Sequence, residues 1–360
     1  MWSYVVPWFS SGRQTSPQPA QLSEVEKMNI HGLPSQGRQR YNVNWQSDDR
    51  PLVIVTSCDF YYGFSIASAL LTDASDVCRV RAVGQRKEPL STLARMGAET
   101  AVIDFGNEKS ITTAFQHKTD CKVILSIGSN EERMKEATCM LQAIDQADVD
   151  LVCLLSQGGA DPTSEWKQLK EFGKLEWQVL SRNGGNSCIL RTDWVQTNFL
   201  FWTDATSKNA EFPLSFGSNH PTLAPLAMTD IAKAVTAIVK NAGTLLTVST
   251  KRTFTLQGPD LVSSTQIVRL LNDALKNPVI GEKQVSREEL KAYLVGLRDN
   301  PKRDGIIPPN DTTIETFLDY FDFVESVDQG RSHDMEDLTG DKGTSLQDFF
   351  KEYARYFRPE

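Results

Sequence analysis

The sequence predicts an α/β protein built on a doubly wound parallel sheet, with a smaller C-terminal α/β lobe. Three observations lead to this prediction. From Pro51 onward, apolar segments of strand length alternate with helical segments of about ten residues or more. The expected strands are apolar along their whole length, which is typical of parallel strands that are buried on both faces. Right-handed crossovers between such strands place helices on both sides of the sheet.

The alternation of strand and helix is regular over the first half of the chain. Strands are expected at residues 51–56, 77–83, 100–105, 122–128 and 150–156. One helix is expected to follow the first strand, and others are expected at residues 91–99, 108–115, 131–146 and 164–182. Consecutive strands are therefore joined by helical crossovers, which is the organisation of a Rossmann-type sheet.

The alternation loosens after residues 187–194. A helix is then expected from Thr229, a strand, a turn and a helix over residues 253–275, and an amphipathic helix over residues 314–324. We expect one domain over residues 49–357, with the smaller lobe within about 195–357. Residues 1–48 are rich in Gln, Ser and Pro without a sustained period. They predict a disordered or loosely docked N-terminal arm.

Charge and composition exclude several classes of function. The chain has 360 residues, a formal net charge of −8 and a pI of about 5.2, so nucleic acid is not an expected partner. No apolar run approaches the roughly 18 to 20 residues of a transmembrane segment. The six cysteines contain no C-x-x-C pair and predict small buried thiols in a reducing compartment, without a metal site. We also recognise no signal peptide, so we expect a cytoplasmic protein.

The turn after the first strand, in the segment VTSCDFYYGFSIASALL at residues 55–71, resembles the opening of a dinucleotide-binding fold. Such turns carry three glycines, which let a pyrophosphate approach the backbone and the helix N-terminus. Here the three positions hold Ser57, Phe60 and Gly63. Gly63 suits close packing of the helix on the strand, and Ser57 is small. Phe60 places a bulky side chain where phosphates need room, so the turn leaves dinucleotide binding open.

With these segments in place, the chain resembles the NmrA-like family, atypical members of the short-chain dehydrogenase/reductase superfamily. The resemblance covers residues 51–357 and rests on an ordered set of motifs. They are the strand, turn and helix at 53–70, the segment VRAVGQRKEPLSTLARMGAETAVIDFGNEKSITTAF at 80–115, SCILRTDWVQTNF at 187–199, LAMTDIAKAV at 226–235, LQGPDLVSSTQIVRLLNDALKNPV at 256–279 and LTGDKGTSLQDFFKEY at 338–353. The resemblance implies an NAD(P)-binding Rossmann domain, and it says more about fold than about activity.

The resemblance also implies cofactor contacts after the second and third strands. Gln85, Arg86 and Lys87 follow the second strand. Cations at this place would meet a ribose 2′-phosphate, which favours NADP(H) over NAD(H). Asp104 and Phe105 match the pair that holds the adenine ring in such folds, although an Asp at a strand end can equally cap the next turn.

The catalytic residues that the resemblance implies are incomplete. In classical members of the superfamily, a tyrosine four residues before a lysine passes a proton to the substrate carbonyl, and the lysine holds the nicotinamide ribose. Lys174 falls at the lysine position, but Lys170 stands in place of the tyrosine. Ser156 matches the catalytic serine, and Gly128 would leave room for the inner ribose, although both residue types are common in turns. We therefore do not expect carbonyl reduction, whereas hydride transfer to a quinone remains open.

Three hypotheses of function follow. The first is an NADP(H)-sensing or protein-binding regulatory protein, and the second is an NADPH-dependent oxidoreductase acting on a quinone, an azo compound or another small acceptor. The third is a scaffold without a dinucleotide, in which Phe60 fills the phosphate site. Gln157 and Asn198 are expected in the cleft for a substrate or partner. The acidic segment 311–341 predicts a solvated face or a docking surface for a basic protein partner.

Overall fold

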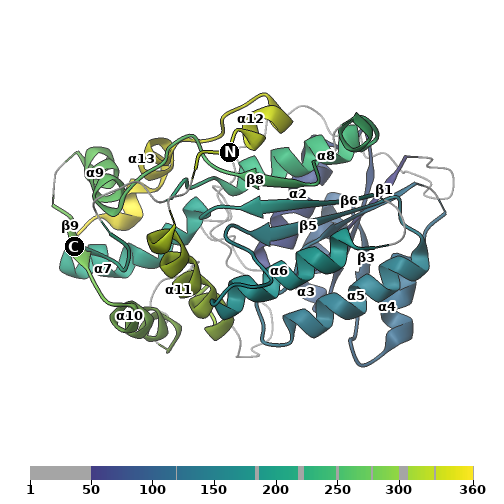
Figure 1. Ribbon diagram of the computed structural model, residues 1–360, viewed down its shortest axis with the longest axis horizontal. Coiled ribbons are helices and arrows are strands. Elements are labelled where there is room, and N and C mark those ends of the chain that lie inside the picture. The colour runs from purple at the N-terminus through teal and green to yellow at the C-terminus, as the bar shows by residue number, and fades with distance from the viewer. Residues whose placement is uncertain are drawn as a thin grey trace, which may run out of the picture.

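The computed structural model describes residues 50–118, 120–182, 186–217, 223–248, 251–276, 279–299, 307–327 and 330–359. Its main feature is a seven-stranded sheet in which every neighbouring pair of strands is parallel, in the order β3-β2-β1-β4-β5-β6-β8 (Figure 1). The strands are β1 (Leu52–Val55), β2 (Arg79–Gly84), β3 (Glu99–Val102), β4 (Cys121–Leu125), β5 (Leu151–Gln157), β6 (Asn186–Thr192) and β8 (Thr253–Leu256). The expected doubly wound parallel sheet is confirmed.

Helices cover both faces of this sheet, and a separate apolar cluster fills each interface. One cluster joins the sheet to α2 (Tyr61–Asp73), α3 (Lys87–Met96), α8 (Met228–Val248) and α12 (Asp334–Thr339). The other cluster joins it to α4 (Glu108–Phe115), α5 (Arg133–Ala147) and α6 (Lys167–Leu180). The strands are buried on both sides, as their continuous apolar sequences require.

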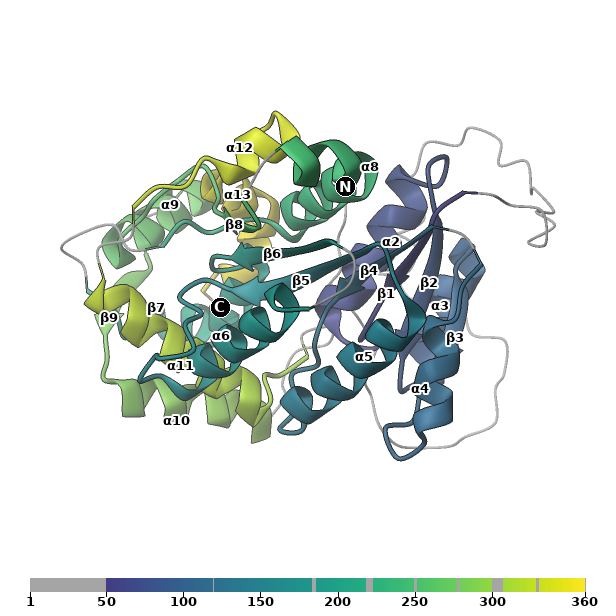
Figure 2. The ribbon, with the colours of Figure 1, turned by 45° about the vertical axis from the view of Figure 1, so that its right-hand side comes forward.

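The C-terminal lobe lies beside the end of the sheet that carries β6 and β8, as Figure 2 shows. It contains η2 (Gln196–Trp202), α7 (Thr203–Asn209), α9 (Ser264–Leu275), α10 (Arg287–Asp299), α11 (Asp311–Ser326), α13 (Leu346–Phe357) and a parallel pair formed by β7 (Glu211–Leu214) and β9 (Gly281–Gln284). Its core is mainly aromatic: Trp194 lies 4.7 Å from Phe317 and from Phe321 between ring centroids.

Polar contacts fasten α11 of the lobe to α6 of the sheet domain. The backbone N–H of Gln168 donates to Asp319 across 2.8 Å, and Arg287 from α10 pairs with the same carboxylate at 2.9 Å. A second cation, the buried Arg133 at the start of α5, pairs with Glu171 of α6 at 3.1 Å. Of these contacts, the hydrogen bond from Gln168 to Asp319 joins the two lobes, whereas the pairs of Arg287 and Arg133 each lie within one lobe.

Several element boundaries differ from those expected. The third strand ends at Val102 instead of residue 105, and the fourth ends at Leu125 instead of residue 128. The helix expected from residue 91 begins at Lys87. Residues 103–105 and 126–128 are loop residues that follow the carboxyl ends of β3 and β4, whereas residues 87–90 form the first turn of α3. The expected arm at residues 1–48 lies outside the described residues, and the proposed division into an arm and one domain stays a prediction.

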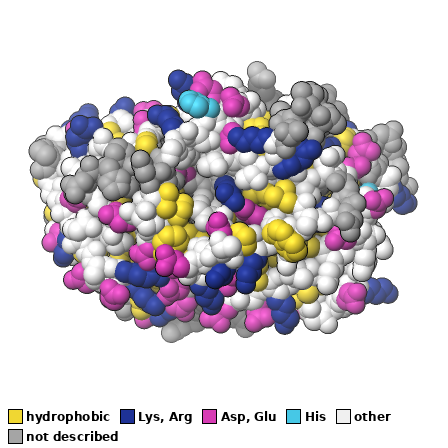
Figure 3. All heavy atoms as spheres, viewed as in Figure 1, with side chains coloured by type: hydrophobic (Ala, Val, Ile, Leu, Met, Phe, Trp, Pro, Cys, Tyr) yellow, Lys and Arg dark blue, Asp and Glu magenta, His cyan; other side chains and the backbone are white. Residues whose placement is uncertain are grey.

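The surface carries acidic and basic side chains side by side, as the face in Figure 3 shows. Part of the acidic segment at residues 311–341 is used within the chain: Asp319 and Asp322 pair with Arg287, and Asp334 pairs with Lys251. All six cysteines are free thiols, and five of them are buried. Within the described ranges, no helix is long and apolar enough to cross a membrane.

Candidate functional site

The candidate site is the crevice at the carboxyl ends of β1 and β4. In the sheet, β1 lies between β2 and β4, so successive crossovers leave in opposite directions from this point. Ligands of doubly wound sheets bind outside the strand ends at such a switch point. The turn that holds Ser57 and Phe60 follows β1 directly, and the loop that holds Gly128 follows β4.

The turn keeps a left-handed residue although it has lost its first two glycines. Ser57 has φ 51°, in the region that glycine adopts most easily, and for a residue with a Cβ this conformation costs about 1–2 kcal/mol. Phe60 is the N-cap of α2, with φ −116° and ψ 160°, and is therefore unstrained. Its side chain offers no hydrogen bond to the helix N-terminus. The backbone of this turn is thus compatible with Phe60, and only the side chain affects the crevice.

Gly63 brings α2 close to β1. A Cβ at this position would lie 2.4 Å from the backbone oxygen of Thr56 and 2.5 Å from that of Ser57, closer than real contacts allow. Glycine is therefore required for this approach of helix and strand. Its expected packing role is confirmed, and its contact with a cofactor stays a prediction.

The ring of Phe60 occupies the crevice. A Cβ at Gly128 would lie 2.9 Å from Phe60 Cε2 and 3.0 Å from Cζ, so the ring rests directly on this glycine. The side chain thus bridges the loops that follow β1 and β4. It covers the place where the sequence analysis expected pyrophosphate and inner ribose.

Arg86 lies over the Phe60 ring and is paired with Asp59. The Arg86 guanidinium carbon lies 5.6 Å from the centroid of the Phe60 ring, and its Nε lies 3.3 Å from Asp59 Oδ2. The Asp59 side chain is only 3% exposed, and its Oδ1 would lie 2.6 Å from a Cβ at Gly84 at the end of β2. The cation that was expected to meet a 2′-phosphate is therefore bound to a carboxylate of the same chain.

The other two residues of the basic loop have different surroundings. Gln85 is exposed, and its Nε2 donates to Glu136 of α5 across 3.2 Å. Lys87 is exposed at the first position of α3. Both lie next to Arg86, so the loop is brought to the crevice as expected. Their contact with a cofactor stays a prediction.

Asp104 and Phe105 lie after β3. Asp104 is exposed, and its Oδ1 accepts a hydrogen bond of 2.8 Å from the N–H of Gly106, which is the turn-capping alternative. Phe105 packs, partly buried, against the apolar cluster under α4 and α5. The contacts within the chain thus account for both residues without an adenine ring, and their binding role stays a prediction.

Two tyrosines at the start of α2 connect the turn to the segment after β6. The Tyr61 hydroxyl lies 3.2 Å from Thr197 Oγ1. Burial raises the pKa of Tyr62, and a hydrogen bond with Asn198 opposes this shift. Asn198 therefore lies beside the turn, close to where a cleft was expected. Its polar side chain is engaged with Tyr62.

Ser156, near the carboxyl end of β5, takes part in a buried polar network with side chains of α6 and β6. Its Oγ donates to Glu176 Oε1 across 2.6 Å, and Arg191 Nη2 lies 2.6 Å from Glu176 Oε2. Ser156 and Glu176 are 4% exposed. The hydroxyl is thereby directed at a carboxylate on α6, an arrangement that supports a structural role. The catalytic role stays a prediction.

Lys174, the other expected catalytic residue, lies on the outer side of α6. It is exposed, whereas its neighbours Gly173 and Leu175 are buried. Its ammonium forms no hydrogen bond or ion pair with any residue that the structure describes. The structure thus does not pair Lys174 with Ser156, whose hydroxyl is bound to Glu176.

The loop after β5 is covered by α11. Gln157 Nε2 donates to the backbone oxygen of Thr192 across 3.3 Å. Gly159, with φ 78°, leaves no room for a Cβ because the Phe323 ring would lie 2.6 Å from it. The expected substrate or partner cleft beside Gln157 is therefore closed on this side by the C-terminal lobe.

The sequence analysis missed the role of Asp59. Parallel strands end at the same edge of a sheet, so an acid after β1 and a base after the neighbouring β2 come together. The order of Asp59 and Arg86 in the sequence carried this signal, because both directly follow predicted strands. An interpretation of Arg86 as a phosphate ligand alone does not predict its ion pair with Asp59.

Solved structures with the same fold were found by comparison. The NADPH-dependent quinone oxidoreductase of Escherichia coli, in a complex with NADPH, has a TM-score of 0.67 and 20% identity, with 84% of this chain and 99% of that chain covered. NmrA, a negative transcriptional regulator in complex with NAD, has a TM-score of 0.63 and 14% identity, with 86% and 96% covered. The fold is that of the NmrA-like proteins.

A third solved structure with this NmrA-like fold is the triphenylmethane reductase of Citrobacter sp. in complex with NADP(H). It has a TM-score of 0.65 and 18% identity and covers 84% of this chain and 99% of its own. No family model and no curated protein matches the sequence. The likeness therefore concerns the fold, over nearly the whole length of each compared chain. Any inference about function has to come from the side chains of the crevice.

Proposed function

We propose that this chain is a non-catalytic NmrA-like regulatory protein that senses NADP(H). In this proposal the Phe60 side chain acts as a gate on the dinucleotide crevice. The observation that carries the proposal is the position of the Phe60 ring on Gly128, with Arg86 held over the ring by Asp59. The chain itself occupies the crevice, using groups that a dinucleotide would have to displace.

Two features support binding once the gate is open. The N-terminus of α2 has no capping side chain, so its first N–H groups are available for an anion. Compared proteins of the same fold hold NADPH, NADP or NAD in their structures. Arg86 and Lys87 lie beside the crevice, where release of Arg86 from Asp59 would let it meet a 2′-phosphate.

The energy of the gate decides between a sensor and a permanently closed scaffold. The Arg86 side chain is 40% exposed, so its ion pair with Asp59 contributes about 0.2–1 kcal/mol. Its contact with the Phe60 ring contributes about 0.5–1 kcal/mol more. Loss of these two contacts, at about 1–2 kcal/mol together, lowers dinucleotide affinity by roughly 5- to 30-fold. A penalty of this size weakens binding without preventing it.

The catalytic residues support a role without turnover. The chain has no Tyr-x-x-x-Lys pair, Ser156 donates to Glu176, and Lys174 is exposed on the outer side of α6. The tyrosine, lysine and serine that classical members use to pass a proton to a carbonyl substrate are therefore not brought together here. Regulation through a partner needs only a surface that changes when Phe60 and Arg86 move.

The test is a calorimetric titration of NADPH into wild-type protein and the variant Phe60→Gly. Glycine restores room over Gly128 and is itself acceptable at an N-cap, so the variant should bind NADPH about tenfold more tightly. Phe60→Tyr keeps the ring and serves as the matched control, with affinity close to wild type. Equal affinity in wild type and Phe60→Gly would contradict the gate, and absence of binding by Phe60→Gly at millimolar NADPH would favour the scaffold.

Cofactor preference is tested with Lys87→Ala. If the exposed ammonium meets the 2′-phosphate, this variant should lose about fivefold in affinity for NADPH, since a partly exposed charged contact contributes about 1 kcal/mol. Its affinity for NADH, which lacks this phosphate, should not change. Equal losses for both cofactors would show that Lys87 acts elsewhere.

The oxidoreductase alternative has its own measurement. Oxidation of NADPH is followed by absorbance with a quinone acceptor, and the regulatory proposal predicts no rate above the buffer control in wild type or Phe60→Gly. Steady oxidation that depends on the acceptor and is faster in Phe60→Gly would replace the regulatory proposal with that of a reductase.

A further inference from the structure

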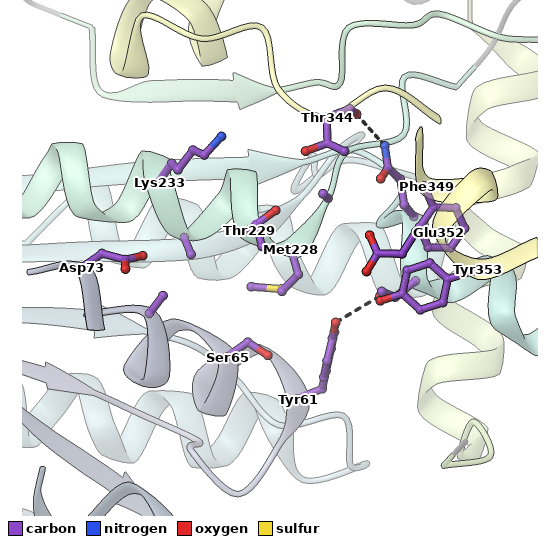
Figure 4. Close-up of a pocket in the computed structure, with 15 residues that line it drawn as sticks. Tyr61, Ser65, Asp73, Met228, Thr229, Lys233, Thr344, Phe349, Glu352 and Tyr353 are labelled. Carbon is purple, nitrogen blue, oxygen red and sulfur yellow. Dashed lines mark hydrogen bonds between the residues drawn. The ribbon is translucent and has the colours of Figure 1, made fainter. Parts of the chain in front are cut away.

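A cavity of about 340 Å³ lies along the flank of α2, outside the dinucleotide crevice. Its walls come from α2, from the first two turns of α8, from α13 and from the segment after β6, as Figure 4 shows. A volume of this size is at the lower end of the range for small-molecule sites. A ligand in this cavity would bind independently of a dinucleotide.

The cavity is lined by a buried amide that lacks one hydrogen bond. Gln196 is 1% exposed, and its Nε2 donates to the backbone oxygens of Pro225 at 3.1 Å and Thr344 at 2.8 Å. These bonds fix the amide, and its Oε1 receives no hydrogen bond from any described residue. A buried acceptor without a donor is costly. A ligand with an N–H or O–H group would remove this cost.

Hydroxyl groups in the same cavity also lack partners. Tyr353 is 8% exposed, and its hydroxyl points toward Tyr61 in Figure 4. Neither the Tyr353 hydroxyl nor that of Ser65 or Thr229 makes a hydrogen bond within the described part of the chain. Each hydroxyl can accept one from a ligand. The cavity therefore offers several acceptors around one space.

The charges around the cavity favour a cation. Lys233 is neutralised by Asp341 at 2.8 Å and by Asp230 at 3.3 Å. Glu352 and Asp73 line the same cavity and form no ion pair with the described residues. Figure 4 places the Glu352 carboxylate over the cavity, beside Met228 and Tyr353. An anion would be repelled here, whereas a positive group would meet an unpaired carboxylate.

The remaining walls are apolar and small. Ala69, Ala232, Met228 and Phe349 line the space between the polar groups. We propose that this cavity binds a small organic cation that joins an apolar or aromatic body to a protonated amine. The body lies between α2 and α8, the ammonium pairs with Glu352, and its N–H groups donate to the cavity's acceptors, including Gln196 Oε1.

The test uses three compounds that share an aromatic body and differ in their polar group. They are 2-phenylethylamine as the cation, 2-phenylethanol as the neutral compound and 3-phenylpropionate as the anion. Calorimetric titration of the full chain should show that the amine binds at least tenfold more tightly than the alcohol, with no binding of the acid. Equal binding of all three, or none by the amine at millimolar concentration, overturns the proposal.

Two acids serve as variant and control. Glu352 is exposed on α13, so Glu352→Gln is expected to fold, and it should weaken binding of the amine about tenfold without changing that of the alcohol. Glu288→Gln removes an exposed acid on α10, away from the cavity, and should leave both affinities unchanged. An equal loss in the two variants would indicate a general charge effect and contradict the site. Unchanged amine affinity in Glu352→Gln would contradict the assigned ion pair.

Discussion

The two regions beside α2 differ in whether the polar and charged groups there find partners within the chain. At the helix N-terminus, Phe60 rests on Gly128 and Arg86 pairs with Asp59, so aromatic, cationic and anionic groups complete one another. Along the helix flank, Gln196 Oε1 has no donor. The crevice is thus covered by the chain's own side chains, whereas the cavity keeps a buried acceptor that has no donor among the described residues.

Side-chain size at the two places explains the difference. In the crevice, Gly63 lets α2 sit low on β1, and the large ring of Phe60 enters the space between two strand ends. On the flank, Ser65 and Ala69 of α2 face Ala232 of α8 across the cavity. Such small side chains leave space between helices that larger residues would fill.

The largest effect is expected from Gly63→Ala, because displacing α2 would disturb both the crevice and the cavity. Gly63→Ala places a methyl group against the backbone oxygens of Thr56 and Ser57, and overpacking of this kind costs about 2–3 kcal/mol. The measurement is the free energy of unfolding in urea. Gly296→Ala is the matched control, because nothing lies within 4 Å of its added Cβ in α10, and it should stabilise by about 0.5–1 kcal/mol. A Gly63→Ala protein as stable as wild type would contradict the close packing of α2 on β1.

The next largest effect is expected when each variant is titrated with the ligands of both regions. Phe60→Gly should raise affinity for NADPH about tenfold and leave 2-phenylethylamine binding unchanged, because the Phe60 ring does not line the cavity. Glu352→Gln should weaken binding of 2-phenylethylamine about tenfold and leave the affinity for NADPH unchanged. If either variant changed both affinities by the same factor, the two regions would have to be treated as one coupled site.

A smaller effect is expected from Ser156→Ala. The variant loses the hydrogen bond to Glu176, while Arg191 still donates to both oxygens of this carboxylate. The free energy of unfolding should fall by about 1 kcal/mol, and NADPH affinity should stay the same. Loss of NADPH binding with unchanged stability would instead place the serine in the crevice.

The smallest effect is expected from Lys174→Ala. The exposed ammonium forms no hydrogen bond or ion pair with described residues, so stability should change by less than about 0.5 kcal/mol. Titration of NADPH should give the wild-type affinity. A fall in affinity for NADPH would support a contact of Lys174 with the nicotinamide ribose, as the family resemblance implies.

Much of the fold could be predicted because its signals are local. Apolar strands such as Leu151–Gln157 alternate with helices, and this order alone indicates a parallel sheet with helical crossovers. The packing role of Gly63 followed from its place in the turn. Strand ends were less predictable, since residues such as Phe105 are apolar yet lie beyond the last strand residue.

The candidate site could be predicted only in part. The sequence placed Phe60, Arg86 and Gly128 after three different strands, and sheet order brings them to one crevice. It could not tell that Arg86 would pair with Asp59, nor that Ser156 would face Glu176, because these partners come from other strands and helices. The cavity at Gln196 was missed because its walls are four segments that are far apart in sequence.

The parallel sheet, the close packing at Gly63 and the absence of a tyrosine and lysine pair can all be predicted from the amino-acid sequence. These follow from periodicity, residue size and spacing along the chain, which need no knowledge of distant contacts. The covered crevice and the open flank of α2 could not be predicted in this way. The reason is that both outcomes depend on which side chains of separate elements meet, and on whether each buried polar group finds a partner there.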